Sequence, residues 1–417
     1  MIDPRLLRED LDGVTAALAR RGWSASDVAE LADLEAAHRD LVGKVDQARA
    51  RQKEASQAIG RASAEDRPAM IAAASELKQE VADLEAALAE AESAFTEAHV
   101  RVPNLPDPAA PDGNEGDGVV LRTVGDRPTF DFPVRDHVDL LEAAGALDME
   151  AGAKVSGARF FYLTGPGVML ELALVRYALD IAARHGHTAV MPPVLVRREA
   201  MFGTGFLPTD EQQLFRTDER DDLYLTGTSE VTLAGLHMGD IMDEVPVRYA
   251  GYSPCFRREA GTYGKDTRGM FRVHQFDKVE LFSFVAPEDG PSEHERLLAI
   301  EEEVFGGLEL HYQVVDIPIG DLGGSAARKF DIEAWMPGQE AFREVTSTSN
   351  TTDYQARRLN TRLRGEHGTT PVHTLNGTAL ALPRAIIALV ETHQQADGTV
   401  RVPAALQPYV GSDILLG

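Results

Sequence analysis

The stretch from Cys255 to Glu280 constrains the fold and the chemistry of this chain more than any other segment. Cationic side chains crowd around its three glycines, and they are Arg257, Arg258, Lys265, Arg268 and Arg272. Apolar-rich segments lie on both sides, at Tyr252–Phe256 and Phe271–Phe284. This pattern predicts a strand, a long glycine-bearing loop and a returning strand, which together make an antiparallel hairpin. Cations on such a hairpin suit a nucleoside triphosphate, although a solvated hairpin with a basic tip would have the same composition.

Composition limits what the rest of the chain can be. Its 417 residues suffice for two domains, and its 43% hydrophobic and 26% charged content is that of a soluble globular protein. The single cysteine, Cys255, excludes a disulfide framework and a cysteine zinc site, which favours a reducing, cytoplasmic setting. We expect no signal peptide and no membrane segment, because no run of about 18 apolar residues occurs. A net charge of −26 means that any nucleic acid must be bound by local basic patches.

The first hundred residues are predicted to be helical. The spacing of Leu6, Leu11, Val14 and Leu18 predicts a short amphipathic helix that ends near Gly22. Two segments with apolar residues at alternating intervals of three and four follow, separated by a break at Gly60–Pro68. Their apolar positions are Leu34, Leu41, Val45, Ala48, Ala55 and Ile59, then Leu77, Val81, Leu84, Leu88, Ala91 and Phe95. The pattern predicts an antiparallel coiled-coil hairpin with arms roughly 45 Å long, in an N-terminal domain over residues 1–100.

The two predicted arms differ in charge. The first arm is basic, through Arg39, Lys44, Arg49, Arg51 and Lys53. The second arm is acidic, through Glu76, Glu80, Asp83, Glu85, Glu90 and Glu92. Two interpretations remain open from these charges. The arms can form cross-arm ion pairs on a solvated surface, or the basic arm can present a cationic edge to a phosphate backbone.

A segment dense in proline, glycine and acidic residues, 101–118, is predicted to be a linker. The region after it, 119–417, is predicted to be a single domain that mixes strands and helices. Helices are expected at Asp136–Ala144 and Leu170–His185, and no glycine fingerprint of a Rossmann fold occurs.

Several strings in residues 119–417 resemble known motifs. Phe256–Glu259 (FRRE), followed by a loop and RVHQFDKVE, resembles motif 2 of the class II aminoacyl-tRNA synthetases, and the longer wording resembles the seryl-tRNA synthetases. Residues 186–193 (GHTAVMPP) are similar to motif 1, and residues 376–384 (NGTALALPR) to motif 3. The resemblance implies an α+β fold, with a class II antiparallel sheet flanked by helices. It also implies a homodimer, since motif 1 forms much of the dimer interface in that class.

The resemblance further implies an activity. A seryl-tRNA synthetase activates L-serine with ATP to seryl-adenylate and pyrophosphate, then transfers serine to the 3′ end of tRNA(Ser). Its N-terminal arm grips the tRNA, which would give the five basic residues of the first arm their role. The chemistry needs in-line positioning and neutralisation of phosphate charge rather than a covalent enzyme intermediate. Arginines and Mg²⁺ supply that neutralisation.

Site residues follow from the matching positions. By resemblance, Arg257 bridges the serine carboxylate and the α-phosphate, and Arg384 binds the γ-phosphate while covering adenine. Glu259 contacts the adenine edge and Phe276 stacks on its face. Serine is held at its amino group by Thr228, Ser229 and Glu230, and at its hydroxyl by Glu280 with Thr378 nearby. Glu344 and Ser347 match ligands of Mg²⁺ and phosphate oxygens. The remaining positions implied for ATP are Arg258, Arg272, Val273, Val345 and Thr346.

The chain departs from the family wording at a few positions. Thr348 and Thr351 stand where family members usually carry cysteine, and the residues alone give no functional account of this. Two other functions remain as alternatives. One is a paralogue that passes activated serine to a non-tRNA acceptor, against which the long arm argues. The other is a non-catalytic RNA-binding regulator, against which the presence of Arg257, Glu344 and Arg384 argues.

Overall fold

The computed structural model describes residues 1–261, 264, 266 and 268–416, and these form two compact units. One unit is Ile2–Leu105, and the other is Pro106–Gly417 together with Met1. The division falls within the proline- and glycine-rich segment 101–118. Among the described residues, no helix is both long enough and apolar enough to cross a lipid bilayer.

The N-terminal unit contains four helices: α1 (Leu6–Glu9), α2 (Leu11–Ala19), α3 (Ala25–Ile59) and α4 (Arg67–His99). The prediction of one helix before Gly22 is wrong, because the chain breaks at Asp10. The backbone of Asp10 leaves the helical region, and its side chain accepts a hydrogen bond of 3.1 Å from Gly13 N, which caps α2. The helix α3 begins at Ser24, where Ser24 and Asp27 form a reciprocal capping box.

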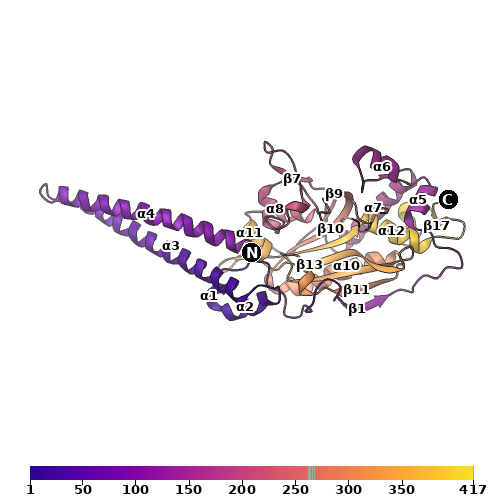
Figure 1. Cartoon of the computed structure of the whole chain (residues 1–417), viewed down its shortest axis with the longest axis horizontal. Helices are drawn as coiled ribbons and strands as arrows, with labels where there is room; N and C mark the ends of the chain where they lie inside the picture. Colours follow the sequence, from indigo (N-terminus) through magenta and orange to yellow (C-terminus); the bar gives the residue numbers. More distant parts are fainter. Residues whose placement is uncertain (262–263, 265, 267, 417) are drawn as a thin grey trace. The chain divides into compact units, whose positions relative to one another are not determined.

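The helices α3 and α4 form the long hairpin seen in indigo and purple in Figure 1. Arg49 pairs with Glu85 and Arg51 with Glu80, so rising numbers on one helix meet falling numbers on the other. The predicted antiparallel hairpin is therefore confirmed. A small core at its base holds both helices against α1 and α2; it comprises Ile2, Leu7, Val14, Leu18, Val28, Leu31, Phe95 and Val102.

An eight-stranded sheet organises the second unit, in the order β1-β11-β12-β13-β16-β10-β9-β4. Neighbouring strands are antiparallel, except that β4 runs parallel to β9. The strands are β1 (Val119–Val124), β11 (Tyr312–Asp316), β12 (Arg328–Met336), β13 (Ala341–Asn350), β16 (His373–Ala381), β10 (Gln275–Val285), β9 (Val247–Phe256) and β4 (Thr188–Val190). This arrangement, with the flanking helices, confirms the predicted fold class.

The central hairpin of the sheet is the one predicted from the Cys255–Glu280 stretch. In it β9 pairs with β10, with Phe256 opposite Gln275 and Val247 opposite Phe284. The returning strand begins at Gln275 and not at Phe271 as predicted. Met270, Phe271 and Val273 are buried in the main core, so they gain burial without joining the ladder. Lys265, one of the five cations of the loop, lies outside the described residues.

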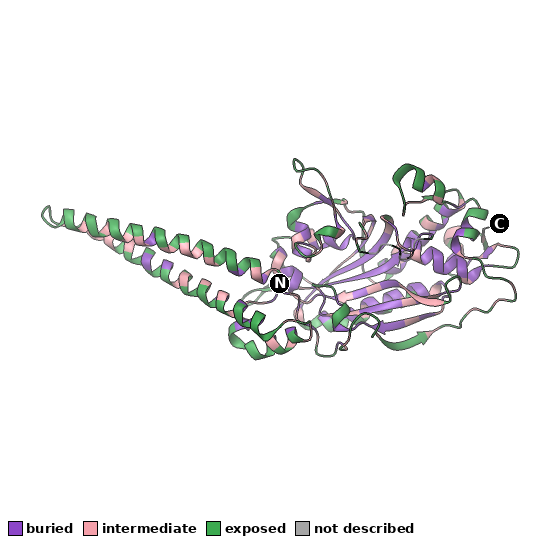
Figure 2. Cartoon of the chain, viewed as in Figure 1, coloured by how far each residue is buried: buried purple, intermediate pink, exposed green. Residues whose placement is uncertain are grey.

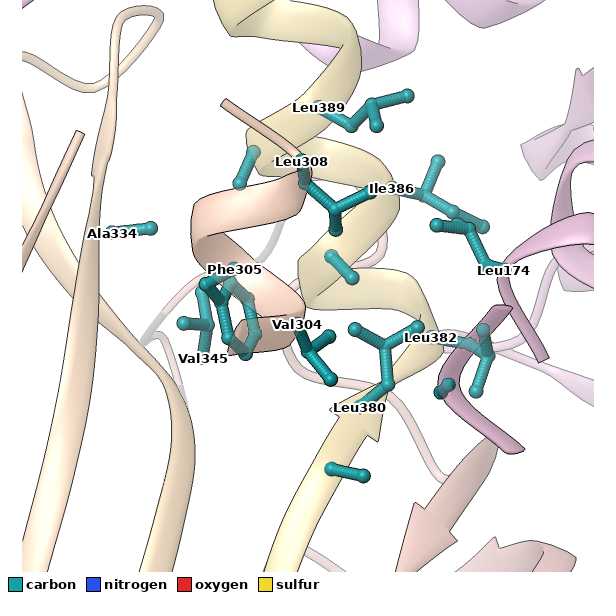
Figure 3. Close-up of a cluster of buried hydrophobic side chains, with 14 of the residues drawn as sticks. Leu174, Val304, Phe305, Leu308, Ala334, Val345, Leu380, Leu382, Ile386 and Leu389 are labelled. Atoms are coloured by element: carbon teal, nitrogen blue, oxygen red, sulfur yellow. The ribbon is translucent and has the colours of Figure 1, made fainter. Parts of the chain in front are cut away.

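Three long helices cover the sheet and close its core: α7 (Pro166–Arg184), α10 (Gly290–Gly307) and α12 (Leu382–His393). Figure 3 shows Phe305 of α10 beside Val345 of β13, and Ile386 of α12 beside Leu174 of α7; all four belong to one buried apolar cluster. Successive side chains of β10 point to opposite faces of the sheet. Val279 and Leu281 point to the face that is packed in this core. The neighbours Lys278 and Glu280 are left for the opposite face of the sheet.

Shorter elements complete the unit. The helices are α5 (His137–Ala143), α6 (Met149–Ser156), α8 (Arg198–Thr204), α9 (Glu230–Gly235), α11 (Tyr354–Leu359) and α13 (Gln407–Val410), with single 3₁₀ turns at Glu211–Gln213, Pro287–Asp289 and Ile319–Asp321. The minor strands are β2 (Leu147–Asp148), β3 (Tyr162–Leu163), β5 (Leu195–Arg197), β6 (Phe215–Arg216), β7 (Leu223–Leu225), β8 (Ile241–Met242), β14 (Arg362–Gly365), β15 (Gly368–Pro371), β17 (Val400–Arg401) and β18 (Ile414–Leu416).

Candidate active site

A cavity of about 360 Å³ lies over the face of β10, β13 and β16. Most of the residues predicted from the sequence line it: Thr228, Glu230, Arg257, Glu259, Arg272, Val273, Phe276, Glu280, Glu344, Val345, Thr346, Ser347, Thr378 and Arg384. These residues come from sequence positions more than 150 apart, so the fold alone brings them together. The cavity has an anionic end, at Glu230 and Glu280, and a cationic end, at Arg384.

Glu230 lies at the anionic end, in the first turn of α9. Its Oε1 accepts hydrogen bonds from Gln355 Nε2 at 2.7 Å and from Asn376 Nδ2 at 3.0 Å. Burial, and then the negative charge of Glu280, raise the pKa of Glu230 to about 7. A carboxylate in this position is suited to an ammonium group, because a cationic ligand would favour its ionised form.

A buried ion pair lies beside Glu230. Lys278 Nζ contacts Glu280 Oε2 and donates a hydrogen bond of 2.7 Å to Thr228 Oγ1. Thr378 Oγ1 donates to the same Glu280 oxygen at 3.3 Å. Burial raises the pKa of Glu280, and Lys278 opposes that shift. The pair leaves a buried carboxylate that can accept a hydrogen bond from the hydroxyl group of a small ligand.

Arg257 connects the two ends of the cavity. Its Nε donates a hydrogen bond of 3.2 Å to the carbonyl of Gly227, just before the Thr228–Glu230 segment. Its guanidinium carbon lies 5.2 Å from the centre of the Phe276 ring. The arginine is therefore held by one nitrogen and one aromatic face, which orients its remaining donors toward the cavity.

At the cationic end, Arg384 Nη1 lies 3.0 Å from Glu344 Oε1. Burial by itself would raise the pKa of Glu344, but the charges of Arg384, Lys329 and Arg257 outweigh it and hold the pKa at about 2. The Glu344 side chain is 44% exposed, so this ionised carboxylate opens onto the cavity. Arg384 lies in the first turn of α12, a position where a helix dipole also favours anions.

A network of opposite charges adjoins the residues that line the cavity. Arg272 contacts Glu259 at 3.0 Å and Asp266 at 3.4 Å, and Arg343 contacts the other oxygen of Asp266 at 2.8 Å. Arg343 and Arg384 both lie over the ring of Phe271, at 4.0 Å and 4.8 Å. These contacts hold three arginines in one cluster, two of them lining the cavity, which favours a ligand with several negative charges.

Two predicted residues do not line the cavity. Ser229 is fully buried, and its hydroxyl donates to the carbonyl of Gly251 at 3.4 Å. Arg258 donates through Nε to Leu214 O at 2.7 Å and lies 4.9 Å over Phe215. The side chains of both residues are held by neighbouring segments of the chain, at Gly251 of β9 and at Leu214 and Phe215, so neither lines the cavity.

Sequence reasoning missed several lining residues, among them Lys278, Lys329, Ser325, Ser349 and Asn376. Lys278 and Asn376 could have been found, because they lie two residues from Glu280 and Thr378 on the same strands. Side chains two apart on a strand share a face. No comparable signal marked Ser325, which lies outside the matching strings.

The five cations of the first arm lie on α3, and most are paired. Arg49 lies 2.7 Å from Glu85 and Arg51 lies 2.5 Å from Glu80, while Lys44 pairs with Asp40 on the same helix. Arg39 lies 3.6 Å from Glu35. Lys53 has no ion pair among the residues that the structure describes. The cross-arm pairs of the first interpretation therefore exist, and their exposure leaves the cations accessible.

Known families match both units. Residues 1–106 match the model of the seryl-tRNA synthetase N-terminal domain, and residues 214–393 match the model of the tRNA synthetase class II core domain (G, H, P, S and T). The serine–tRNA ligase of Nocardia farcinica is 53% identical over 418 residues, which cover 100% of this chain and 99% of that protein. The serine–tRNA ligase of Rhodococcus jostii is 52% identical, with 100% of both chains covered.

Solved structures agree with these relatives. The seryl-tRNA synthetase of Pyrococcus horikoshii, complexed with ATP, is 40% identical with a TM-score of 0.93, covering 100% of this chain and 99% of that one. The cytoplasmic serine–tRNA ligase of Naegleria fowleri, in complex with AMP, is 30% identical with a TM-score of 0.89 and the same coverage. The similarity extends through the arm and the core, and it favours neither alternative function. The chain therefore belongs to the seryl-tRNA synthetases, the ATP-dependent serine–tRNA ligases of class II.

Proposed function

We propose that this cavity joins L-serine to ATP, and that the product seryl-adenylate then charges tRNA(Ser). The observation that carries the proposal is the division of the cavity into an anionic end and a cationic end with Arg257 between them. An amino acid has an ammonium group and a carboxylate, and ATP adds a chain of phosphates. The anionic end therefore matches the ammonium group of the amino acid, Arg257 matches its carboxylate, and the cationic end matches the phosphates of ATP.

The proposed serine subsite uses the anionic end. Glu230 and Thr228 bind the ammonium group, and Glu280 accepts a hydrogen bond from the serine hydroxyl, with Thr378 beside it. When alanine binds instead, Glu280 is left without its hydroxyl partner. Sites built this way reject the analogue by about 10⁴-fold or more. Ser229 acts only by supporting the backbone of this segment.

The proposed ATP subsite uses the cationic end. Arg257 contacts both the serine carboxylate and the α-phosphate, and it stabilises charge as the carboxylate oxygen attacks phosphorus and pyrophosphate leaves. Phe276 and Glu259 bind adenine, while Arg384 binds the γ-phosphate. Arg272, Val273, Val345 and Thr346 line the same subsite. Arg258 contributes by holding the Leu214–Phe215 loop.

The same end can hold a divalent cation. Glu344 is ionised at neutral pH and exposed to the cavity, and Ser347 lines the same cavity with a hydroxyl group. Mg²⁺ is commonly bound by one or two carboxylates together with substrate phosphates. Glu344 and Ser347 would therefore hold Mg²⁺, which supplies charge neutralisation to the phosphates when bound.

We also propose a homodimer, formed through α7 and the segment after β4. The side chains of Met169, Leu172 and Met191 are 65%, 51% and 80% exposed, although all three are apolar. Apolar side chains gathered beside a buried helix face are typical of subunit contacts. Sedimentation of a Met169→Asp/Leu172→Asp variant should show a monomer, whereas an unchanged dimer would place the interface elsewhere.

The proposed partners include tRNA(Ser), bound by the cations of α3, and the proposed location is the cytoplasm. The single thiol of the chain, that of Cys255, is buried and unpaired, which fits a reducing compartment. The decisive experiment measures ATP–pyrophosphate exchange with each amino acid, with and without tRNA. Exchange that depends on serine supports the proposal, and exchange that prefers another amino acid would overturn it.

A further inference from the structure

A hydrogen-bonded network of buried polar side chains lies behind Glu230, and the reaction described above does not use it. Gln355 of α11 is fully buried at its centre. Its Nε2 donates to Glu230 Oε1 at 2.7 Å and to Thr204 O at 3.2 Å. Its Oε1 accepts from Thr374 Oγ1 at 2.9 Å. One amide therefore links Glu230 to the main chain at Thr204 and to Thr374 of β16.

The hydroxyl groups of this network determine which way the amide points. Thr351 Oγ1 lies 2.7 Å from Thr374 O and 2.6 Å from Thr374 Oγ1. Each hydroxyl has one proton, and across 2.6 Å one of the two must donate to the other, so Thr351 can donate to Thr374 Oγ1 while Thr374 donates to Gln355 Oε1. Gln355 must then present its oxygen to Thr374, which turns its NH₂ group toward Glu230.

A second amide completes the arrangement. Asn376 Nδ2 donates to the same Glu230 oxygen at 3.0 Å, and Thr348 Oγ1 donates to the Asn376 carbonyl at 2.9 Å. Thr348 and Thr351 are the two residues that the sequence left without a functional account, and both are fully buried. The Thr351 hydroxyl belongs to the network that holds the Gln355 amide, and the Thr348 hydroxyl binds the main-chain carbonyl of Asn376, the residue that carries the second amide.

Both amides donate to Oε1, and no described residue donates a hydrogen bond to Glu230 Oε2. We propose that Gln355, held by Thr351 and Thr374, is a positioning residue that keeps Glu230 ionised with Oε2 presented to the substrate ammonium group. The inference rests on the proposed role of Glu230 in serine binding. It adds that the carboxylate geometry is set by residues that never touch serine.

The charges around Glu230 explain why such support matters. Glu280 of β10 opposes its ionisation, and Lys278 and Arg257 favour it. Burial and Glu280 raise the pKa of Glu230 to about 7, so its ionisation near neutral pH depends on the groups that favour the charged form, the Gln355 hydrogen bond among them. Loss of an amide donor would shift the balance toward the neutral acid, which binds an ammonium group poorly.

The test compares Gln355→Met and Thr351→Val with Thr361→Val as a matched control. Thr361 is equally buried and donates to a carbonyl at 2.9 Å, but it does not line the cavity. KM for serine and KM for ATP are measured by pyrophosphate exchange from pH 6.5 to 8.5. Glycerate, which lacks the amino group, is measured as a competitor of serine.

Gln355→Met should raise KM for serine about tenfold at pH 7, with KM for ATP and glycerate inhibition unchanged. The increase should shrink as pH rises, because Glu230 ionises without help at higher pH. Thr351→Val should give a smaller rise that Thr351→Ser reverses, and Thr361→Val should give none. If Gln355→Met does not fold, the threonine variants decide the result by themselves.

Two outcomes would overturn the inference. One is an unchanged KM for serine in Gln355→Met and Thr351→Val, and the other is an equal loss of serine and glycerate binding. Glu230→Gln separates this failure from a failure of the proposed function. If Glu230→Gln leaves KM for serine unchanged, the proposed serine subsite is wrong. If it raises KM while the network variants do not, only the positioning role is wrong.

Discussion

The helical hairpin and the cavity use charge in opposite ways. In the hairpin, Arg49 and Glu85 form a pair whose side chains are 59% and 43% exposed. In the cavity, Lys278 and Glu280 form a pair that is almost wholly buried. Figure 2 shows the same contrast at larger scale, with few buried residues along the hairpin and many across the sheet.

This contrast separates what each region can do. An exposed pair contributes about 0–1 kcal/mol, so α3 can exchange Glu85 for a phosphate at little cost. Removing one partner of a buried pair lowers the stability of the folded protein by about 3–5 kcal/mol, because the other charge is left buried and unpaired. The charges of the cavity are therefore fixed in place before substrate arrives. The hairpin is thus suited to a large, hydrated polyanion, and the cavity to a small ligand that must be discriminated.

The strongest test of the contrast is Arg257→Ala. We expect serine-dependent pyrophosphate exchange to fall about 10³-fold, because the variant lacks a fixed donor at the reacting centre. Arg257→Lys should not restore it, since a single ammonium cannot contact two groups as a guanidinium does. Thermal unfolding should change little. Near-normal exchange by the alanine variant would remove Arg257 from the reaction.

Shortening the hairpin should affect the other half-reaction. Replacing residues 41–88 by a short turn retains Leu31 and Phe95, which belong to the core at the base of the arm. Pyrophosphate exchange should stay within about twofold of the parent, and tRNA charging should fall about 10²-fold as phosphate contacts are lost. Normal charging by this variant would show that the arm does not bind the substrate tRNA.

Lys278→Met tests the buried pair. Loss of the ammonium leaves Glu280 buried without its counter-ion, so its already raised pKa should rise further. A carboxyl with a raised pKa is protonated below that pKa, so serine binding should be weakest at low pH and recover as pH rises. We expect KM for serine to rise about 30-fold at pH 7.

The matched control for that variant is Lys278→Met/Glu280→Gln, which replaces the pair by two neutral groups. Glutamine does not titrate, so the KM of this double variant for serine should not fall as pH rises, as it should in Lys278→Met. An identical pH dependence in both variants would mean that Glu280 is not the titrating group.

The smallest expected effect comes from the surface of the hairpin. Replacing Arg49, Arg51 and Lys53 by glutamine should weaken tRNA binding about tenfold and flatten its salt dependence by up to about one unit of slope per lost contact. Glu80→Gln/Glu85→Gln removes the opposite partners and should leave binding unchanged or tighter. Equal losses in both variants, measured over a salt series, would favour a purely structural role for the ion pairs.

Much of the fold was predictable from local patterns. The hairpin follows from apolar residues such as Val45 and Val81 at heptad spacing, and β9 and β10 follow from apolar runs around a glycine-rich loop. Two predicted element boundaries were wrong, at places where hydrophobic periodicity competes with another interaction. Asp10 ended a helix that the leucine spacing continued, and Phe271 was buried in the core without joining a strand. A polar cap and a tertiary contact outweighed periodicity in these two places.

By itself, the sequence determined the helical hairpin, the central pair of strands, a few further helices and the motifs that identify the family. It did so because periodicity, turns and motif wording depend on neighbouring residues. Only the tertiary structure decided which side chains share the cavity, turning Ser229 and Arg258 away from it and bringing in Lys278 and Asn376. The same is true of Gln355, whose contact with Glu230 spans 125 positions. Burial and hydrogen-bond geometry are set by packing across strands, and no local pattern in the chain encodes them.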